Sequence, residues 1–87
     1  MEVNELQNDV KSYVMTEFLP GEDPAELTDT TPLISGGILD SIATVKLVAF
    51  LEETYGIEFQ PHEISVDHLD TLADIASITS AKIGGKN

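Results

Sequence analysis

The stretch of sequence that decides the fold is GGILDSIATVKL, residues 36–47. Two consecutive glycines disfavour a helix before it, and Asp-Ser followed by apolar residues is typical of a helix N-terminus. We predict a helix from about Asp40 to Tyr55 that ends at Gly56, because glycine tolerates the left-handed conformation of many helix C-caps. Capping is the ordinary role of an Asp-Ser pair, so the pair alone does not indicate a functional serine.

The predicted helix carries two apolar stripes. The stripe whose spacing suits a core consists of Leu47, Val48, Phe50 and Leu51. The second stripe, which ends near Glu52 and Glu53, consists of Ile42, Val45 and Ala49. A chain of 87 residues has a thin core and cannot easily cover both stripes, so the second indicates a docking face. The alternative is a central helix in which both stripes are buried.

Working outward, helical periodicity predicts one helix before Pro20-Gly21 and another that starts near Thr71 and ends at Gly84-Gly85. The apolar positions of the first helix are Val3, Leu6, Val10, Tyr13, Val14 and Phe18. Those of the last helix are Leu72, Ile75, Ala76, Ile78 and Thr79. Thr71 and Asp74 resemble a capping box, with aspartate in place of the usual glutamate or glutamine.

Two irregular segments join these helices. Residues 20–39 are rich in proline and glycine, and we predict an ordered crossover with one turn at Pro24 to Leu27. Its apolar residues can pin it across a bundle: Leu27, Leu33, Ile34, Ile38 and Leu39. Residues 57–70 predict a short irregular helix, because the alternating residues 57–59 are too few to form a sheet. The fold class is therefore all-α.

Composition excludes several function classes. With 87 residues and 9.4 kDa the chain forms one small domain, which favours a binding or carrier module over a self-contained enzyme. Sixteen acidic and four basic residues give a net charge of −12, so nucleic acid and anionic membranes are repelled and partners should present basic patches. There is no cysteine for a disulfide or a thiolate metal site. We see neither a signal peptide nor a membrane span and expect a cytoplasmic protein.

Ser41 stands where a phosphate would be stabilised. A helix N-terminus offers unpaired N–H groups and a partial positive charge, both of which favour an anion. Gly36 and Gly37 leave room for a bulky group to approach, and no histidine or lysine is spaced to activate Ser41 as a nucleophile. The pattern indicates a serine that carries a phosphodiester rather than one that attacks a substrate.

The chain resembles an acyl carrier protein, specifically the stand-alone type II phosphopantetheine carriers. The attachment motif of that family is matched by residues 37–42, Gly-Ile-Leu-Asp-Ser-Ile, and the order and length of the segments agree over roughly residues 3–83. The resemblance implies a four-helix bundle with three main helices, one short helix and a long loop between the first and second helices. It implies a carrier domain at residues 1–83 and a flexible C-terminal tail at residues 84–87.

The resemblance also implies roles for individual residues. Ser41 would carry covalent 4'-phosphopantetheine, transferred from coenzyme A by a phosphopantetheinyl transferase. Asp40 would assist that transfer by helping to hold the magnesium of the transferase. The positions that would contact partner enzymes are Ile42, Val45, Ala49, Glu52 and Glu53.

By the same resemblance, the thiol of the arm would hold an acyl or aminoacyl cargo as a thioester, so the protein itself catalyses nothing. The implied partners are an acyl- or amino-acid-activating ligase and downstream acyl-transfer enzymes, and the implied state is a monomer. Lys46, Ala43 and Ala49 depart from the pattern usual in fatty-acid carriers, where the first two positions are commonly acidic and the third is often methionine. These departures disfavour a housekeeping fatty-acid carrier and favour a carrier with a dedicated ligase, such as a D-alanyl, amino-acid or polyketide carrier.

Three other functions are alternatives to the carrier. A calcium-binding loop requires acids, glycine and glutamate at fixed positions, and neither residues 22–34 nor residues 58–70 supply them. A zinc or hydrolase site would rest on His62, Glu63, Asp67 and His68, but histidines six residues apart do not share a helix face. The third is a helical adaptor, a degenerate carrier whose second helix docks partners while Ser41 stays unmodified.

Overall fold

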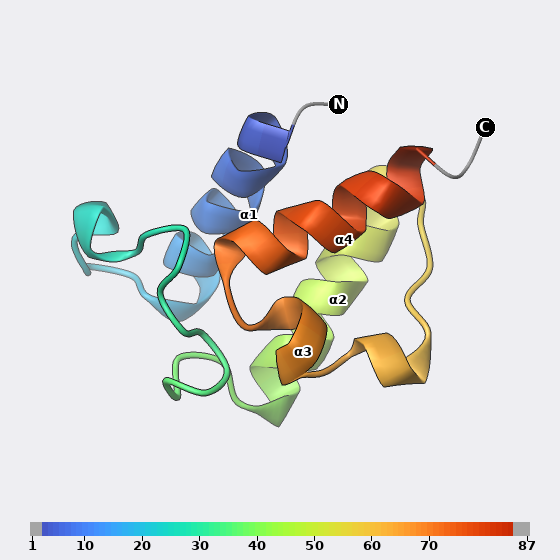
Figure 1. The fold of residues 1–87 in the computed structure, drawn as a ribbon. Helices are drawn as coiled ribbons and strands as arrows, with labels where there is room; N and C mark the ends of the chain where they lie inside the picture. Colours follow the sequence, from blue (N-terminus) through green and yellow to red (C-terminus); the bar gives the residue numbers. More distant parts are fainter. Residues whose placement is uncertain (1–2, 85–87) are drawn as a thin grey trace.

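The computed structural model describes residues 3–84, which fold into helices and turns with no strand (Figure 1). In chain order the elements are α1 (Val3–Phe18), the 3₁₀ turn η1 (Pro24–Glu26), α2 (Ser41–Tyr55), the 3₁₀ turn η2 (Pro61–Glu63), α3 (Val66–Leu69) and α4 (Leu72–Gly84). The predicted all-α class is confirmed, with three main helices, one short helix and a long connection between α1 and α2. No helix within residues 3–84 is long and apolar enough to cross a bilayer.

The ends of α2 follow from its sequence as predicted. Asp40 is the N-cap, and its Oδ1 accepts a hydrogen bond from the backbone N–H of Ala43 at 2.7 Å. Gly56 closes the helix with a φ of 65°, in the left-handed region that glycine adopts without steric cost. At the start of α4, Thr71 Oγ1 accepts a hydrogen bond from the N–H of Asp74 at 3.0 Å, which is the threonine half of the predicted capping box.

The core lies where α1, α2 and α4 meet, with α1 packed against α4 and α2 (Figure 1). The fully buried large side chains are Leu6, Val10, Val14, Leu33, Leu39, Leu47, Leu51, Leu69, Leu72, Ile75 and Thr79. The Tyr13 ring of α1 stacks on Phe50 of α2 with ring centroids 4.1 Å apart, and both side chains are half-buried. Most of this core matches the predicted positions, including Thr79, whereas Tyr13, Phe18 and Ile78 are half-buried.

The predicted ordered crossover is confirmed, with η1 at the expected turn. Leu27, Leu33 and Leu39 are buried in the core, so the connection is pinned at three points. The N–H of Leu39 also donates to the carbonyl oxygen of Leu33 at 2.8 Å, which closes residues 33–39 into a loop directly before α2. In Figure 1 the connection, coloured from cyan to green, descends from the end of α1 to the start of α2.

Two predictions at the chain's end have different outcomes. Gly84 is the last residue of α4, in agreement with a helix that ends there. Residues 85–87, which include Gly85 and most of the predicted flexible tail, lie outside the described residues, as do residues 1 and 2. The domain boundary at residue 83 therefore stays a prediction.

Candidate functional site

Ser41 is the first residue of α2, and its side chain is exposed. The first four N–H groups of a helix have no partner within the helix. Asp40 satisfies one of them, because its Oδ1 accepts from the N–H of Ala43, and its carbonyl oxygen accepts the first hydrogen bond of the helix, from the N–H of Thr44 at 2.9 Å. Thr44 Oγ1 donates to the same carbonyl oxygen at 2.8 Å, so the cap is held from two sides. The N–H groups of Ser41 and Ile42 donate no hydrogen bond within residues 3–84 and lie in the same first turn as the exposed hydroxyl.

An open groove of about 520 Å³ adjoins Ser41. It is formed by the last residues of the crossover, the first turns of α2 and the segment that leads into α3, with the lining residues Ile34, Leu39, Asp40, Ser41, Thr44, Val45, Ile64, Ser65 and Val66. The lining combines apolar side chains with the hydroxyls of Ser41, Thr44 and Ser65. A groove of this size accommodates an extended small-molecule chain that carries both apolar and amide groups.

Asp70, at the junction of α3 and α4, holds the crossover in place before the site. Its Oδ1 accepts from the N–H groups of Ile34 at 2.9 Å and Ser35 at 2.8 Å, and its Oδ2 accepts from Ser35 Oγ at 2.8 Å. Its carbonyl oxygen also accepts from the N–H of Leu33 at 2.6 Å. The hydrogen bonds from Ser35 hold the pKa of the Asp70 carboxyl below its ordinary value, so it stays ionised to lower pH than a free aspartate does.

The two glycines before the site serve the turn itself. A Cβ on Gly36 would collide with the carbonyl oxygen of Pro32, and Gly37 has a φ of 84° that other residues rarely adopt. The N–H of Gly37 donates to the carbonyl oxygen of Ile34 at 3.1 Å. The prediction that these glycines leave room for a bulky group is not needed to explain them, because backbone geometry alone requires both.

The two-stripe prediction for α2 is confirmed in its geometry. Leu47, Val48 and Leu51 are buried, whereas Ile42 is 69% exposed and Val45 is 61% exposed. Ala49 continues the exposed stripe one turn further along. We call Ile42, Val45 and Ala49 the docking stripe. The alternative of a fully enclosed central helix is wrong.

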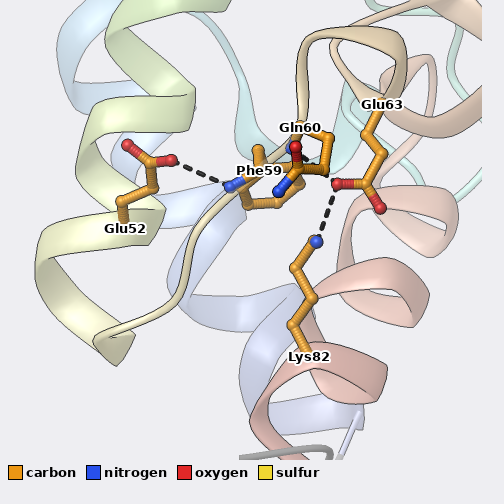
Figure 2. Close-up of polar contacts among 5 residues, drawn as sticks. All are labelled: Glu52, Phe59, Gln60, Glu63 and Lys82. Carbon is orange, nitrogen blue, oxygen red and sulfur yellow. Dashed lines mark hydrogen bonds and ion pairs between the residues drawn. The ribbon is translucent and has the colours of Figure 1, made fainter.

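The two acidic residues at the end of the docking stripe differ in their surroundings. Glu53 is exposed, whereas Glu52 is half-buried and its Oε2 accepts a hydrogen bond from the N–H of Phe59 at 2.9 Å (Figure 2). Glu52 therefore fastens the end of α2 to the segment that follows it. The resemblance to carriers predicted only a partner contact for Glu52, and no local sequence signal indicates this hydrogen bond.

Figure 2 also shows how the same segment is joined to α4. Lys82 Nζ donates to Glu63 Oε1 at 2.7 Å and lies 5.1 Å from the centre of the Phe59 ring, and Glu63 Oε1 also accepts from the N–H of Gln60 at 2.7 Å. The hydrogen bond from Lys82 lowers the pKa of Glu63 below its ordinary value. Glu63, weighed above as a zinc or hydrolase residue, is thus engaged in a structural ion pair.

Within residues 3–84 no group of three or more histidine or acidic side chains could hold a metal ion. His62 lies in η2 and His68 in α3, and both side chains are exposed. His62, Glu63, Asp67 and His68 therefore do not form such a group.

The fold and the site define a small helical bundle with an exposed serine at the N-terminus of a capped helix, the arrangement expected of a carrier. Comparison with protein-family models supports this class: the model for a phosphopantetheine attachment site matches residues 19–78, more than half of the chain. The chain belongs to this family of acyl-carrier type, whose domain is the attachment site for covalently bound 4'-phosphopantetheine. None of the curated proteins compared with the chain matches it.

The residues around Ser41 fit this group. Attachment requires an accessible hydroxyl, and Ser41 is exposed on the edge of the groove. A phosphodiester requires stabilisation of negative charge, which the N-terminus of the 15-residue helix α2 supplies. The groove beyond the hydroxyl offers Val45 and Val66 as apolar wall and Ser65 as a polar one.

Proposed function

We propose that Ser41 is the residue that carries 4'-phosphopantetheine, and that the protein uses it to hold an acyl or aminoacyl group as a thioester. The observation that carries this proposal is the exposure of Ser41 at the N-terminus of α2, on the edge of the groove. Ser35 is engaged with Asp70, and Ser65 is half-buried before a helix of only four residues. Neither offers the same combination of an accessible hydroxyl and a long helix.

The residues of this chain contribute position and charge. When bound, the group supplies a thiol that forms thioesters. Ser41 Oγ forms the bond to phosphorus, a bond of the coenzyme A diphosphate breaks, the nucleotide portion leaves, and the serine proton passes to a base of the transferase. The N–H groups of Ser41 and Ile42 stabilise the negative charge that results.

Asp40 has two roles in this proposal, one for each carboxylate oxygen. Oδ1 caps α2, and Oδ2 has no hydrogen bond within the described residues and is available to the magnesium of the transferase. Asp40→Asn separates the two roles, because asparagine caps helices about as well as aspartate. We expect Asp40→Asn to keep the melting temperature and to slow modification of Ser41. Asp40→Ala should lower both the melting temperature and the rate of modification.

The partners we propose are a phosphopantetheinyl transferase, an acyl- or amino-acid-activating ligase and downstream acyl-transfer enzymes of a cytoplasmic pathway for lipid or secondary metabolite synthesis. They would contact the docking stripe, with Glu53 at its end. The exposed Lys46 beside Val45 supports a dedicated ligase over the common fatty-acid enzymes, because it adds a positive charge to this face. The protein itself catalyses no reaction and raises the effective concentration of its cargo at each partner.

Intact mass after incubation with coenzyme A, magnesium and a promiscuous phosphopantetheinyl transferase tests the proposal. We expect a gain of one phosphopantetheine group in the wild type and in the control Ser65→Ala, and no gain in Ser41→Ala. Because Asp40 is the N-cap, Ser41→Ala should leave the fold intact, which circular dichroism can verify. If a transferase that is active on another carrier gives no gain, the carrier proposal fails and the unmodified adaptor takes its place.

A further inference from the structure

A second pocket lies between the crossover connection and the end of α1. Its volume is about 150 Å³, and its apolar lining comes from Met15, Leu19, Leu27 and Ile38. Leu27 is buried and the other three are half-buried, so they form the floor. This pocket shares no residue with the groove at Ser41.

Three carboxylates stand around this floor. Glu22, Asp23 and Glu26 line the pocket and are exposed, so they form its rim on the solvent side. Asp23 uses Oδ1 to cap η1, accepting from the N–H of Ala25 at 2.9 Å. We call these four floor residues and three carboxylates the loop pocket.

The negative charge of the rim is not neutralised from within the described part of the chain. The ion pair found there joins Lys82 to Glu63, on α4 and η2. Lys11 lies one helical turn before Met15 and forms no ion pair with the rim within residues 3–84. A partner therefore meets three clustered carboxylates over an apolar floor, on a protein with a net charge of −12.

We propose that the loop pocket receives the side chain of an arginine or lysine from a partner protein. The aliphatic stem would lie on Met15, Leu19 and Ile38, and the cationic head would lie among the carboxylates, which is how these side chains divide between apolar and polar surroundings. A volume of about 150 Å³ suits one group the size of benzene, hence one side chain and not a helix. An acyl chain would instead bring apolar surface against carboxylates and cost their hydration.

This inference rests on the proposed function in one respect, because it takes the partner to be an enzyme that acts at Ser41. Ile38 precedes Ser41 by three residues, so their Cα atoms are at most about 11 Å apart. One enzyme that covers Ser41 can therefore also reach the loop pocket. The pocket would add a contact on the crossover to those on α2.

The test is a titration of the full chain with n-propylguanidinium, a model of the arginine side chain, followed by amide NMR shifts at constant ionic strength. We expect saturable shifts at Leu19, Leu27 and Ile38 in the millimolar range. Guanidinium and 1-propanol, which each carry half of the probe, should not saturate in that range. If either binds as tightly as propylguanidinium, or if no probe saturates, the inference is overturned.

A pair of double variants separates the loop pocket from general charge. Glu22→Gln/Glu26→Gln should weaken binding of propylguanidinium by about threefold to tenfold, as expected for the loss of two exposed charge contacts. Glu5→Gln/Glu58→Gln removes the same charge elsewhere and should leave binding unchanged. Equal weakening in both variants would refute the pocket.

The mass experiment on Ser41 keeps the two proposals apart. Wild-type protein that gains phosphopantetheine but does not bind the probe refutes the loop pocket alone. Protein that binds the probe but gains no mass refutes the carrier function and leaves the pocket as a docking site of the adaptor.

Discussion

Replacing Val45 and Leu47 by alanine, one at a time, tests whether α2 separates stability from partner binding. Leu47 is completely buried, and such a substitution costs about 2–5 kcal/mol because it removes burial and leaves a cavity. Val45 is 61% exposed, so the loss of two methyl groups forfeits only about 0.6 kcal/mol of burial. The better helix propensity of alanine returns about as much.

The expected free energies translate into a simple thermal assay. For a domain of this size about 1 kcal/mol shifts the melting temperature by roughly 4–8 °C. Circular dichroism should therefore show Leu47→Ala melting at least about 8 °C below the wild type, and Val45→Ala within about 3 °C of it. The transferase should modify Val45→Ala with a raised KM, because the docking stripe is altered.

The result that would refute this reasoning is equal destabilisation by both substitutions, since Val45 would then belong to the core. Ser12→Ala, an exposed change on α1, is the matched control for handling and concentration. If Val45→Ala is stable and is modified with the wild-type KM, the docking stripe does not contact the transferase.

Three further predictions concern stability. Thr79 Oγ1 is buried with no hydrogen-bond partner among the described residues. Thr79→Val keeps the shape of the side chain and removes the hydroxyl, so it should relieve about 1 kcal/mol of desolvation and raise the melting temperature by several degrees. A lower melting temperature would show that the hydroxyl is engaged. The folded pKa of Asp70 lies below its unfolded value of about 4, so its contribution is complete above that pH and is lost as the pH falls through the folded pKa. Thermal melts between pH 5 and pH 2 should thus fall less steeply for Asp70→Asn than for the wild type, and parallel slopes would contradict the assignment. With sixteen acidic and four basic residues, the melting temperature should rise as salt increases over about 10–200 mM, and a flat response would rule out self-repulsion as a significant cost.

The elements that sequence predicted well are those set by local chemistry. Asp40 and Gly56 mark the ends of α2 because capping depends on side chains and backbone conformations within four residues. The buried and exposed stripes of α2 follow equally from helical spacing and from the limited size of the chain. The choice of Ser41 combined the same local chemistry with the carrier motif of residues 37–42, and its role as the attachment residue stays a prediction.

The contacts that sequence did not predict join distant segments. Asp70 accepts hydrogen bonds from Ser35, which lies 35 positions earlier in the chain. In the sequence Asp70 is only one more acidic residue before a helix, so its position gives no sign of this contact. The hydrogen bond from Phe59 to Glu52 and the ion pair of Lys82 with Glu63 depend on how the segment after α2 returns against α4. Such pairings need the tertiary arrangement, because each acid has many possible partners in a chain with sixteen of them.

These distant contacts restrain the backbone before Ser41 and leave the exposed side chains of α2 free to differ between carriers. Leu33, Ile34 and Ser35 are held by Asp70, and the bond from Leu39 to Leu33 carries that restraint to the residue before the N-cap of α2. These hydrogen bonds restrain the backbone that presents Ser41, so in the proposed carrier the reach of the cargo would come from the arm rather than from the crossover. The choice of partner would then depend on exposed side chains that have no structural contacts of their own. Lys46 is such a residue, because it is exposed and forms no ion pair within residues 3–84, so changing its charge should alter which enzymes bind without a cost in stability.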